Sequence, residues 1–163
     1  MKHMLLLILG GLLFAAGVRQ ASATNEPVSR AGTARTADGV PIRYEVRGRG
    51  DPALVFIHGW ASDRSVWQEQ VNIFARGHTL VTVDLGGHGA SGANRASWSI
   101  ASLAQDVVTV VKALGLKRVV LIGHSMGGPV ALLAAGRMPD RILGVIGVDT
   151  LHNAELLKGL AAR

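Results

Sequence analysis

Four short, nearly continuous hydrophobic runs rich in β-branched side chains mark the sequence. They are residues 53–57, 80–84, 119–122 and 143–148. Runs of this kind are typical of strands buried on both faces of a parallel sheet. Two further strand candidates, residues 33–37 and 42–46, flank the turn signal Asp38-Gly39-Val40-Pro41 and predict a hairpin.

Between these runs the apolar residues take the spacing of helices. We predict helices over residues 66–74, 100–114 and 126–138, with Ser99 as the N-cap of the second and Pro139 ending the third. Strands that alternate with helices imply right-handed βαβ units. The predicted fold class is therefore α/β, a mostly parallel sheet with helices on both faces.

A polar residue lies at the end of each of the four runs or shortly after it. These residues are His58, Asp84, Ser125 and Asp149. In an open parallel sheet, ligands bind at the carboxyl ends of the strands. We therefore expect the four residues to lie around one site.

The first 23 residues have the pattern of a signal peptide. Lys2 precedes an uncharged run over residues 4–18, and Ala21-Ser22-Ala23 provides a small-x-small cleavage site. The run of about 15 residues is shorter than the roughly 20 that span a bilayer. We expect an exported protein, periplasmic or secreted, which contacts the membrane only if the signal segment stays uncleaved. Residues 24–32 are predicted to be a linker, and the domain is expected over residues 33–163.

Composition limits the stability and the partners of this domain. The chain of 163 residues is 48% hydrophobic and 17% charged, as in a globular protein, and has no cysteine that could form a disulfide. Its net charge of +6 is dispersed rather than gathered in a stripe. Nucleic acid is therefore not an expected partner.

Ser125 is the strongest candidate for chemistry. A serine nucleophile must be exposed on a tight turn between a strand and a helix, which requires small residues two positions before and after it. Gly123 and Gly127 occupy these positions, in the order Gly123-His124-Ser125-Met126-Gly127. The backbone N–H of Met126, at the start of the following helix, would then face a developing oxyanion.

Three segments together resemble the α/β-hydrolase fold family. They are His58-Gly59-Trp60, the loop Asp84-Leu85-Gly86-Gly87-His88-Gly89-Ala90-Ser91, and the turn around Ser125. The resemblance implies that Trp60 and Met126 supply the oxyanion-hole amides, that His58 shapes its loop, and that Asp84 and His88 hold the loop after their strand. It also implies that residues 33–163 are an incomplete α/β-hydrolase domain, truncated after the sixth strand.

The family's histidine base has no clear counterpart. In the family, the triad runs serine, acid, histidine, and the histidine usually follows an eighth strand. Here Asp149 resembles an acid placed after the sixth strand, and His152 is the only histidine after Ser125. We interpret His152 as a loop residue rather than the base. The sixth strand is expected to be an exposed edge that favours self-association.

The predicted function is a serine hydrolase acting on an ester or related acyl bond of a small molecule, through an acyl-enzyme on Ser125. No cofactor or metal is expected, because water resolves the acyl-enzyme. Two alternatives use the same fold, acyl transfer and cofactor-free peroxidation. A third alternative is a non-catalytic or vestigial fragment, because the chain as it stands is expected to be catalytically incomplete.

Overall fold

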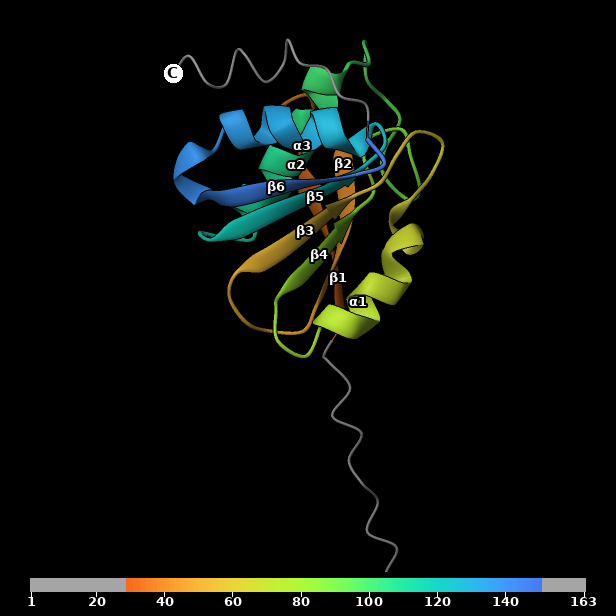
Figure 1. The fold of residues 1–163 in the computed structure, drawn as a ribbon. Helices are drawn as coiled ribbons and strands as arrows, with labels where there is room; N and C mark the ends of the chain where they lie inside the picture. Colours follow the sequence, from red (N-terminus) through yellow and green to blue (C-terminus); the bar gives the residue numbers. More distant parts are fainter. Residues whose placement is uncertain (1–28, 151–163) are drawn as a thin grey trace, which may run out of the picture.

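The computed structural model describes residues 29–150, which form a six-stranded sheet with the order β1-β2-β4-β3-β5-β6 (Figure 1). Strands β2, β4, β3 and β5 lie inside it, while β1 and β6 form its two edges. The pairs β4–β3, β3–β5 and β5–β6 are parallel, whereas β1–β2 and β2–β4 are antiparallel. The predicted, mostly parallel sheet is confirmed. The strands are β1 Ser29–Arg35, β2 Pro41–Arg47, β3 Ala53–Ile57, β4 Leu80–Val83, β5 Val119–His124 and β6 Ile142–Val148.

The helices cover both faces of the sheet, as predicted. Helices α2 and α3 pack on one face and α1 on the other (Figure 1). Because successive side chains of a strand point to opposite faces, Val55 and Ile57 of β3 contribute to the α2 and α3 side, while Phe56 packs with Trp67 on the α1 side. The helices are η1 Arg64–Trp67, α1 Gln68–Phe74, α2 Ile100–Ala113, α3 Gly127–Gly136 and η2 Pro139–Arg141.

Several predicted boundaries are corrected. The linker expected over residues 24–32 is wrong at its C-terminal end, because β1 begins at Ser29 and pairs with β2 from there. The helix expected over residues 126–138 spans Gly127–Gly136, and Pro139 begins the 3-10 turn η2. Ser99 caps α2 as predicted, and its hydroxyl accepts a 3.1 Å hydrogen bond from the Ser102 backbone N–H.

Strand β6 is at the edge of the sheet in the described range, and its apolar residues Leu143, Ile146 and Val148 are exposed. The prediction that residues 143–148 are buried on both faces is therefore wrong, while the predicted exposed edge is confirmed for residues 29–150. None of the helices in this range is long and apolar enough to cross a membrane. The predicted signal peptide and His152 lie outside the described residues.

Candidate active site

Ser125 stands in a tight turn between β5 and α3. Its φ of 50° is left-handed, a conformation that costs energy for any residue with a Cβ. Neighbouring backbone holds it there. The Ser125 N–H donates to the Val148 carbonyl over 3.0 Å, and the Ser125 carbonyl accepts from the Gly128 N–H at 3.0 Å and from the Thr150 hydroxyl at 2.7 Å. The end of β6 thus fixes the conformation of the turn.

The glycines around Ser125 are required by close backbone contacts. A Cβ on Gly123 would collide with the Gly127 carbonyl oxygen and would lie 2.7 Å from the Gly128 nitrogen. A Cβ on Gly127 would collide with the Ile57 carbonyl oxygen and lie 2.7 Å from that of His58. The start of α3 therefore packs directly on the end of β3, which brings the loop after β3 against the turn.

Trp60 and Met126 lie on these two adjoining segments. Gly59, the residue before Trp60, is so close to the turn that a Cβ there would lie 3.2 Å from the Ser125 Cβ. Within residues 29–150, the backbone N–H groups of Trp60 and Met126 donate no hydrogen bond. Free backbone amide donors on segments that adjoin a serine are able to stabilise a negatively charged oxygen.

The neighbouring His58 is fully buried and holds two loops together. Its Nε2 accepts a 3.1 Å hydrogen bond from the Leu85 N–H, so its Nδ1 carries the proton and donates to the Gly59 carbonyl over 2.7 Å. Burial lowers the pKa of His58, and the nearby His88 lowers it further. With both ring nitrogens occupied, His58 acts as a brace for the loops after β3 and β4.

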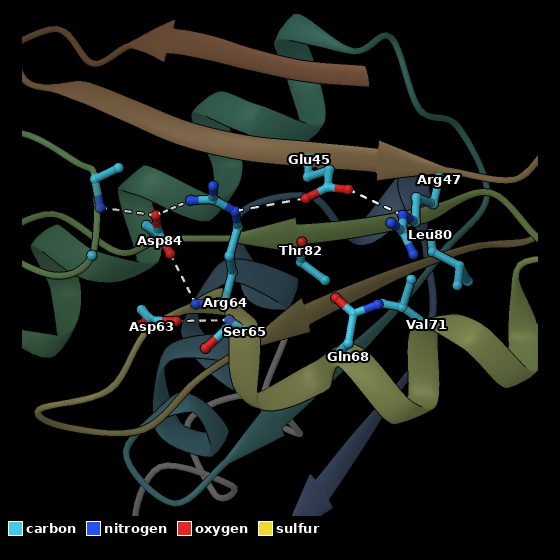
Figure 2. Close-up of a pocket in the computed structure, with 12 residues that line it drawn as sticks. Glu45, Arg47, Asp63, Arg64, Ser65, Gln68, Val71, Leu80, Thr82 and Asp84 are labelled. Atoms are coloured by element: carbon cyan, nitrogen blue, oxygen red, sulfur yellow. Dashed lines mark hydrogen bonds and ion pairs between the residues drawn. The ribbon is translucent and has the colours of Figure 1, made fainter. Parts of the chain in front are cut away.

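Asp84 also links the loops after β3 and β4. Its buried carboxylate accepts hydrogen bonds from the Arg64 N–H at 2.8 Å and from the Ala90 N–H at 2.9 Å, and it pairs with the Arg64 guanidinium. Figure 2 shows this network at one end of a polar cavity of about 350 Å³, where Arg64 also lies near Glu45. The structure agrees with the expectation that Asp84 holds the loop after β4.

Asp149 follows β6 beside the turn. It is exposed and has a φ of 42°, and the residues on either side of it, Val148 and Thr150, both hydrogen bond to Ser125. His58, Asp84, Ser125 and Asp149 follow β3, β4, β5 and β6, so all four lie at the carboxyl ends of neighbouring strands. Asp84, however, lines the polar cavity with Arg64 and forms no hydrogen bond with Ser125 or Asp149 within residues 29–150.

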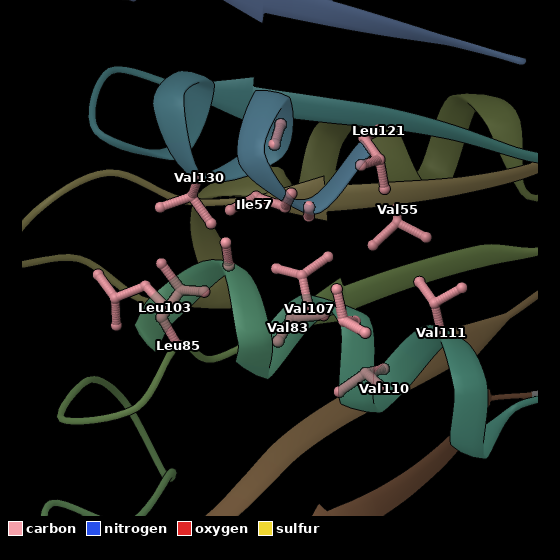
Figure 3. Packing of buried hydrophobic residues seen from close by; sticks show 14 of the residues in the cluster. Val55, Ile57, Val83, Leu85, Leu103, Val107, Val110, Val111, Leu121 and Val130 are labelled. Atoms are coloured by element: carbon pink, nitrogen blue, oxygen red, sulfur yellow. The ribbon is translucent and has the colours of Figure 1, made fainter. Parts of the chain in front are cut away.

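Sequence reasoning missed the buried pair of Arg95 and Asp106. Asp106 is fully buried on α2, where its carboxylate lies 2.6 Å from the Arg95 guanidinium and accepts a 2.9 Å hydrogen bond from the Gly86 N–H. Burial raises the pKa of Asp106, while Arg95 acts against this rise. Figure 3 shows Leu103, Val107 and Val110 on the face of α2 that meets the core. Asp106 lies three residues after the first of these and four before the last, and this helical spacing was the available signal.

An open cavity of about 670 Å³ lies over the carboxyl ends of the strands. It is lined by Trp60 and Met126, by His88 and by apolar side chains of the segment before and within α2, among them Trp98, Ile100 and Leu103. No Asp, Glu, Lys or Arg side chain lines it in the described range. The residues 29–150 also contain no group of three or more His, Cys, Asp or Glu side chains arranged to hold a metal ion.

Comparisons with known proteins identify the fold. A family model for the α/β hydrolase fold matches residues 52–161. The chain is 36% identical over 108 residues to the dihydrolipoyllysine-residue acetyltransferase component of the acetoin cleaving system of Cupriavidus necator, a match that covers 66% of this chain and 29% of that protein.

Solved structures give the same result. A membrane phospholipase A described as a bacterial virulence factor superposes with a TM-score of 0.69 at 29% identity, covering 76% of this chain and 40% of that one. An esterase from Exiguobacterium antarcticum superposes with a TM-score of 0.69 at 28% identity, covering 72% of this chain and 44% of that one. The chain therefore spans less than half the length of each of these three proteins.

Proposed function

The chain belongs to the α/β-hydrolase fold family, and on that premise we propose that it carries the nucleophile and oxyanion site of a serine hydrolase acting on an ester or related acyl bond. The observation that carries the proposal is the left-handed φ of 50° at Ser125, in the turn between β5 and α3. Strained non-glycine residues persist where the surrounding structure holds them, and they cluster at functional sites. A nucleophilic serine requires such a turn.

In the proposed reaction, the Ser125 Oγ attacks the acyl carbon while a base takes the hydroxyl proton. Negative charge then develops on the carbonyl oxygen, where the amides of Trp60 and Met126 stabilise it. The leaving alkoxide takes this proton from the base and departs as the alcohol, and water attacks the acyl-enzyme to release the acid and free Ser125. The N-terminus of α3 (Gly127–Gly136) adds positive potential at the same point.

The proposed base lies outside residues 29–150. Within that range, His58, His78, His88 and His124 form no hydrogen bond with Ser125, and the first is fully occupied by the two loops that it braces. We assign Asp149 as the acid that orients the base, because its neighbours on both sides bind the Ser125 backbone.

Labelling with a fluorophosphonate tests the proposal, because this reagent phosphonylates an activated serine. Purified protein whose fold has been checked by circular dichroism is expected to be labelled, and Ser125→Ala is expected to abolish labelling. Labelling that survives in Ser125→Ala refutes the assignment of the nucleophile. If the folded wild-type chain is not labelled, the alternative of a non-catalytic domain holds for this chain. Loss of labelling in His152→Ala would identify the base.

Acyl transfer is the second candidate, favoured by the acetyltransferase name of the Cupriavidus necator relative. The two reactions share the acyl-enzyme and differ in the group that attacks it. Product analysis with an added alcohol separates them, because a transferase forms the new ester in preference to the free acid.

A further inference from the structure

The side chain of Trp98 forms one wall of the 670 Å³ cavity. Although this side chain is partly exposed, the residues around it hold it in place. Its side chain is 44% exposed. The ring lies against the backbone of the loop after β4. A Cβ on Gly86 or Gly87 would lie only 3.1 or 3.0 Å from it. The two glycines therefore leave the space that the indole occupies.

Arg95 also contacts the indole ring of Trp98. The carbon at the centre of its guanidinium lies 5.1 Å from the ring centroid, within the range of a cation–π interaction. The Arg95 side chain is only 4% exposed and is itself fixed by two carboxylates, Asp106 at 2.6 Å and Asp38 at 2.7 Å. Asp106 also binds the Gly86 N–H. Helix α2, the β1–β2 turn and the loop after β4 are thus joined in one network that ends on the indole.

A buried ion pair contributes little net stability, so the position of this network indicates a role other than stabilising the fold. Removing two charges from water costs several kcal/mol, and apolar residues of similar volume often do as well. Here the pair contacts a partly exposed aromatic ring, which lines the same cavity as Ile100, Leu103 and Met126. An apolar cavity without charged side chains gives no compensation to a charged group that enters it.

We propose that Trp98, positioned by Arg95, is a specificity-determining wall of the acyl site: it favours an uncharged, apolar acyl chain and disfavours a chain with a charge at its far end. The proposal rests on the proposed function, in which the acyl carbon sits at Ser125. Trp98 contacts the substrate directly. Arg95 is a positioning residue that acts through it.

The test is the binding of a matched pair of esters, measured by equilibrium dialysis in the Ser125→Ala background. Methyl octanoate and monomethyl suberate have acyl chains of the same length, but the second ends in a carboxylate. Because this variant cannot turn over the ester, the result does not depend on whether the chain is catalytically active. We expect methyl octanoate to bind about tenfold more tightly, the factor produced by about 1.4 kcal/mol.

Variants then distinguish the contact made by Trp98 from the positioning role of Arg95. Trp98→Ala is expected to weaken methyl octanoate binding about tenfold and to reduce the preference for it. Arg95→Met is expected to weaken binding and to change the near-ultraviolet circular dichroism of the indole. Arg95→Lys, which keeps a cation near the ring, is expected to restore part of both. The control is Arg118→Met, which removes an exposed Arg–Asp pair at 2.6 Å elsewhere on the surface.

Unchanged binding in Trp98→Ala, or equal affinity for the two esters, would overturn the proposal. Because Trp98 is partly exposed, its truncation remains informative even if Arg95→Met fails to fold. Failure of the proposed function has a different signature, the absence of fluorophosphonate labelling in the wild-type chain.

Discussion

Replacing Gly123 by alanine places a methyl group where the turn at Ser125 has no space for it. The new Cβ would collide with the Gly127 carbonyl oxygen and lie 2.7 Å from the Gly128 nitrogen, whereas ordinary contacts of a Cβ begin at 3.4 Å. Both neighbours are backbone atoms at the start of α3, so no side chain can rotate away. Strand β5 and helix α3 must separate.

The size of the effect follows from these contacts. Overpacking in a well-packed interior costs roughly 1–3 kcal/mol. Because the colliding atoms belong to the backbone, we expect the upper end, a decrease of about 3 kcal/mol in the free energy of unfolding. For a domain of this size, about 3 kcal/mol corresponds to a decrease of roughly 10 °C in Tm. The same movement displaces the Ser125 hydroxyl from the Trp60 and Met126 amides, so labelling should be lost at temperatures where the variant is still folded.

Gly77→Ala is the matched control. A Cβ on Gly77 meets no atom within 4 Å, and its φ does not lie in the left-handed region. Its free energy of unfolding should remain within about 1 kcal/mol of the wild-type value. Urea unfolding followed by circular dichroism gives both values, and the fluorophosphonate gives the labelling rate. If Gly123→Ala is as stable as Gly77→Ala and is labelled as fast as the wild type, the argument that close packing forms the turn is refuted.

Three further outcomes are expected. The unfolded chain takes up a proton on His58 near pH 6.5, but burial lowers the pKa of this histidine in the folded protein. The free energy of unfolding should therefore decrease as the pH falls below 6.5, by at most about 1.4 kcal/mol per pH unit. Urea titrations at pH 7.5 and 5.5 should show a smaller decrease in His58→Gln than in the wild type. Asp84→Asn should lower the free energy of unfolding by about 1–3 kcal/mol because it weakens a buried hydrogen-bonded pair. Its control, Asp51→Asn, removes only an exposed pair and should change the free energy of unfolding by less than about 1 kcal/mol. Equal effects of the two variants in urea titrations would contradict the network in Figure 2. Ile146→Lys on the exposed edge strand β6 should reduce self-association in sedimentation velocity, and an unchanged distribution of sedimenting species would exclude that edge as the contact.

The sequence was most informative where a local rule alone fixes the structure. Residues 53–57 form β3 as predicted, because a short run of apolar, β-branched residues is typical of a buried strand. Ser99 caps α2 because a hydroxyl at that position satisfies an otherwise free N–H. The turn at Ser125 was identified because the glycines it requires are adjacent in the chain.

Local patterns were misleading where long-range pairing decides. The residues 29–32 are mostly small or polar and resemble a linker, yet they pair with β2 because the hairpin continues past its apolar part. Residues 143–148 resemble a buried strand, but their exposure depends on what lies beside β6, and the composition of the strand does not encode its place in the sheet.

The sequence by itself thus determined the strand-and-helix alternation and the turn at Ser125, since each depends on residues close together in the chain. Only the tertiary structure decided the strand order, the bracing of the loops by His58 and Asp84, and the network of Arg95 and Asp106 that ends on Trp98. The physical reason is that the sequence around a charged residue does not show whether it is buried or exposed until its partner is known. Those partners lie 11 to 57 residues away in the chain, brought together by the packing of the sheet and α2.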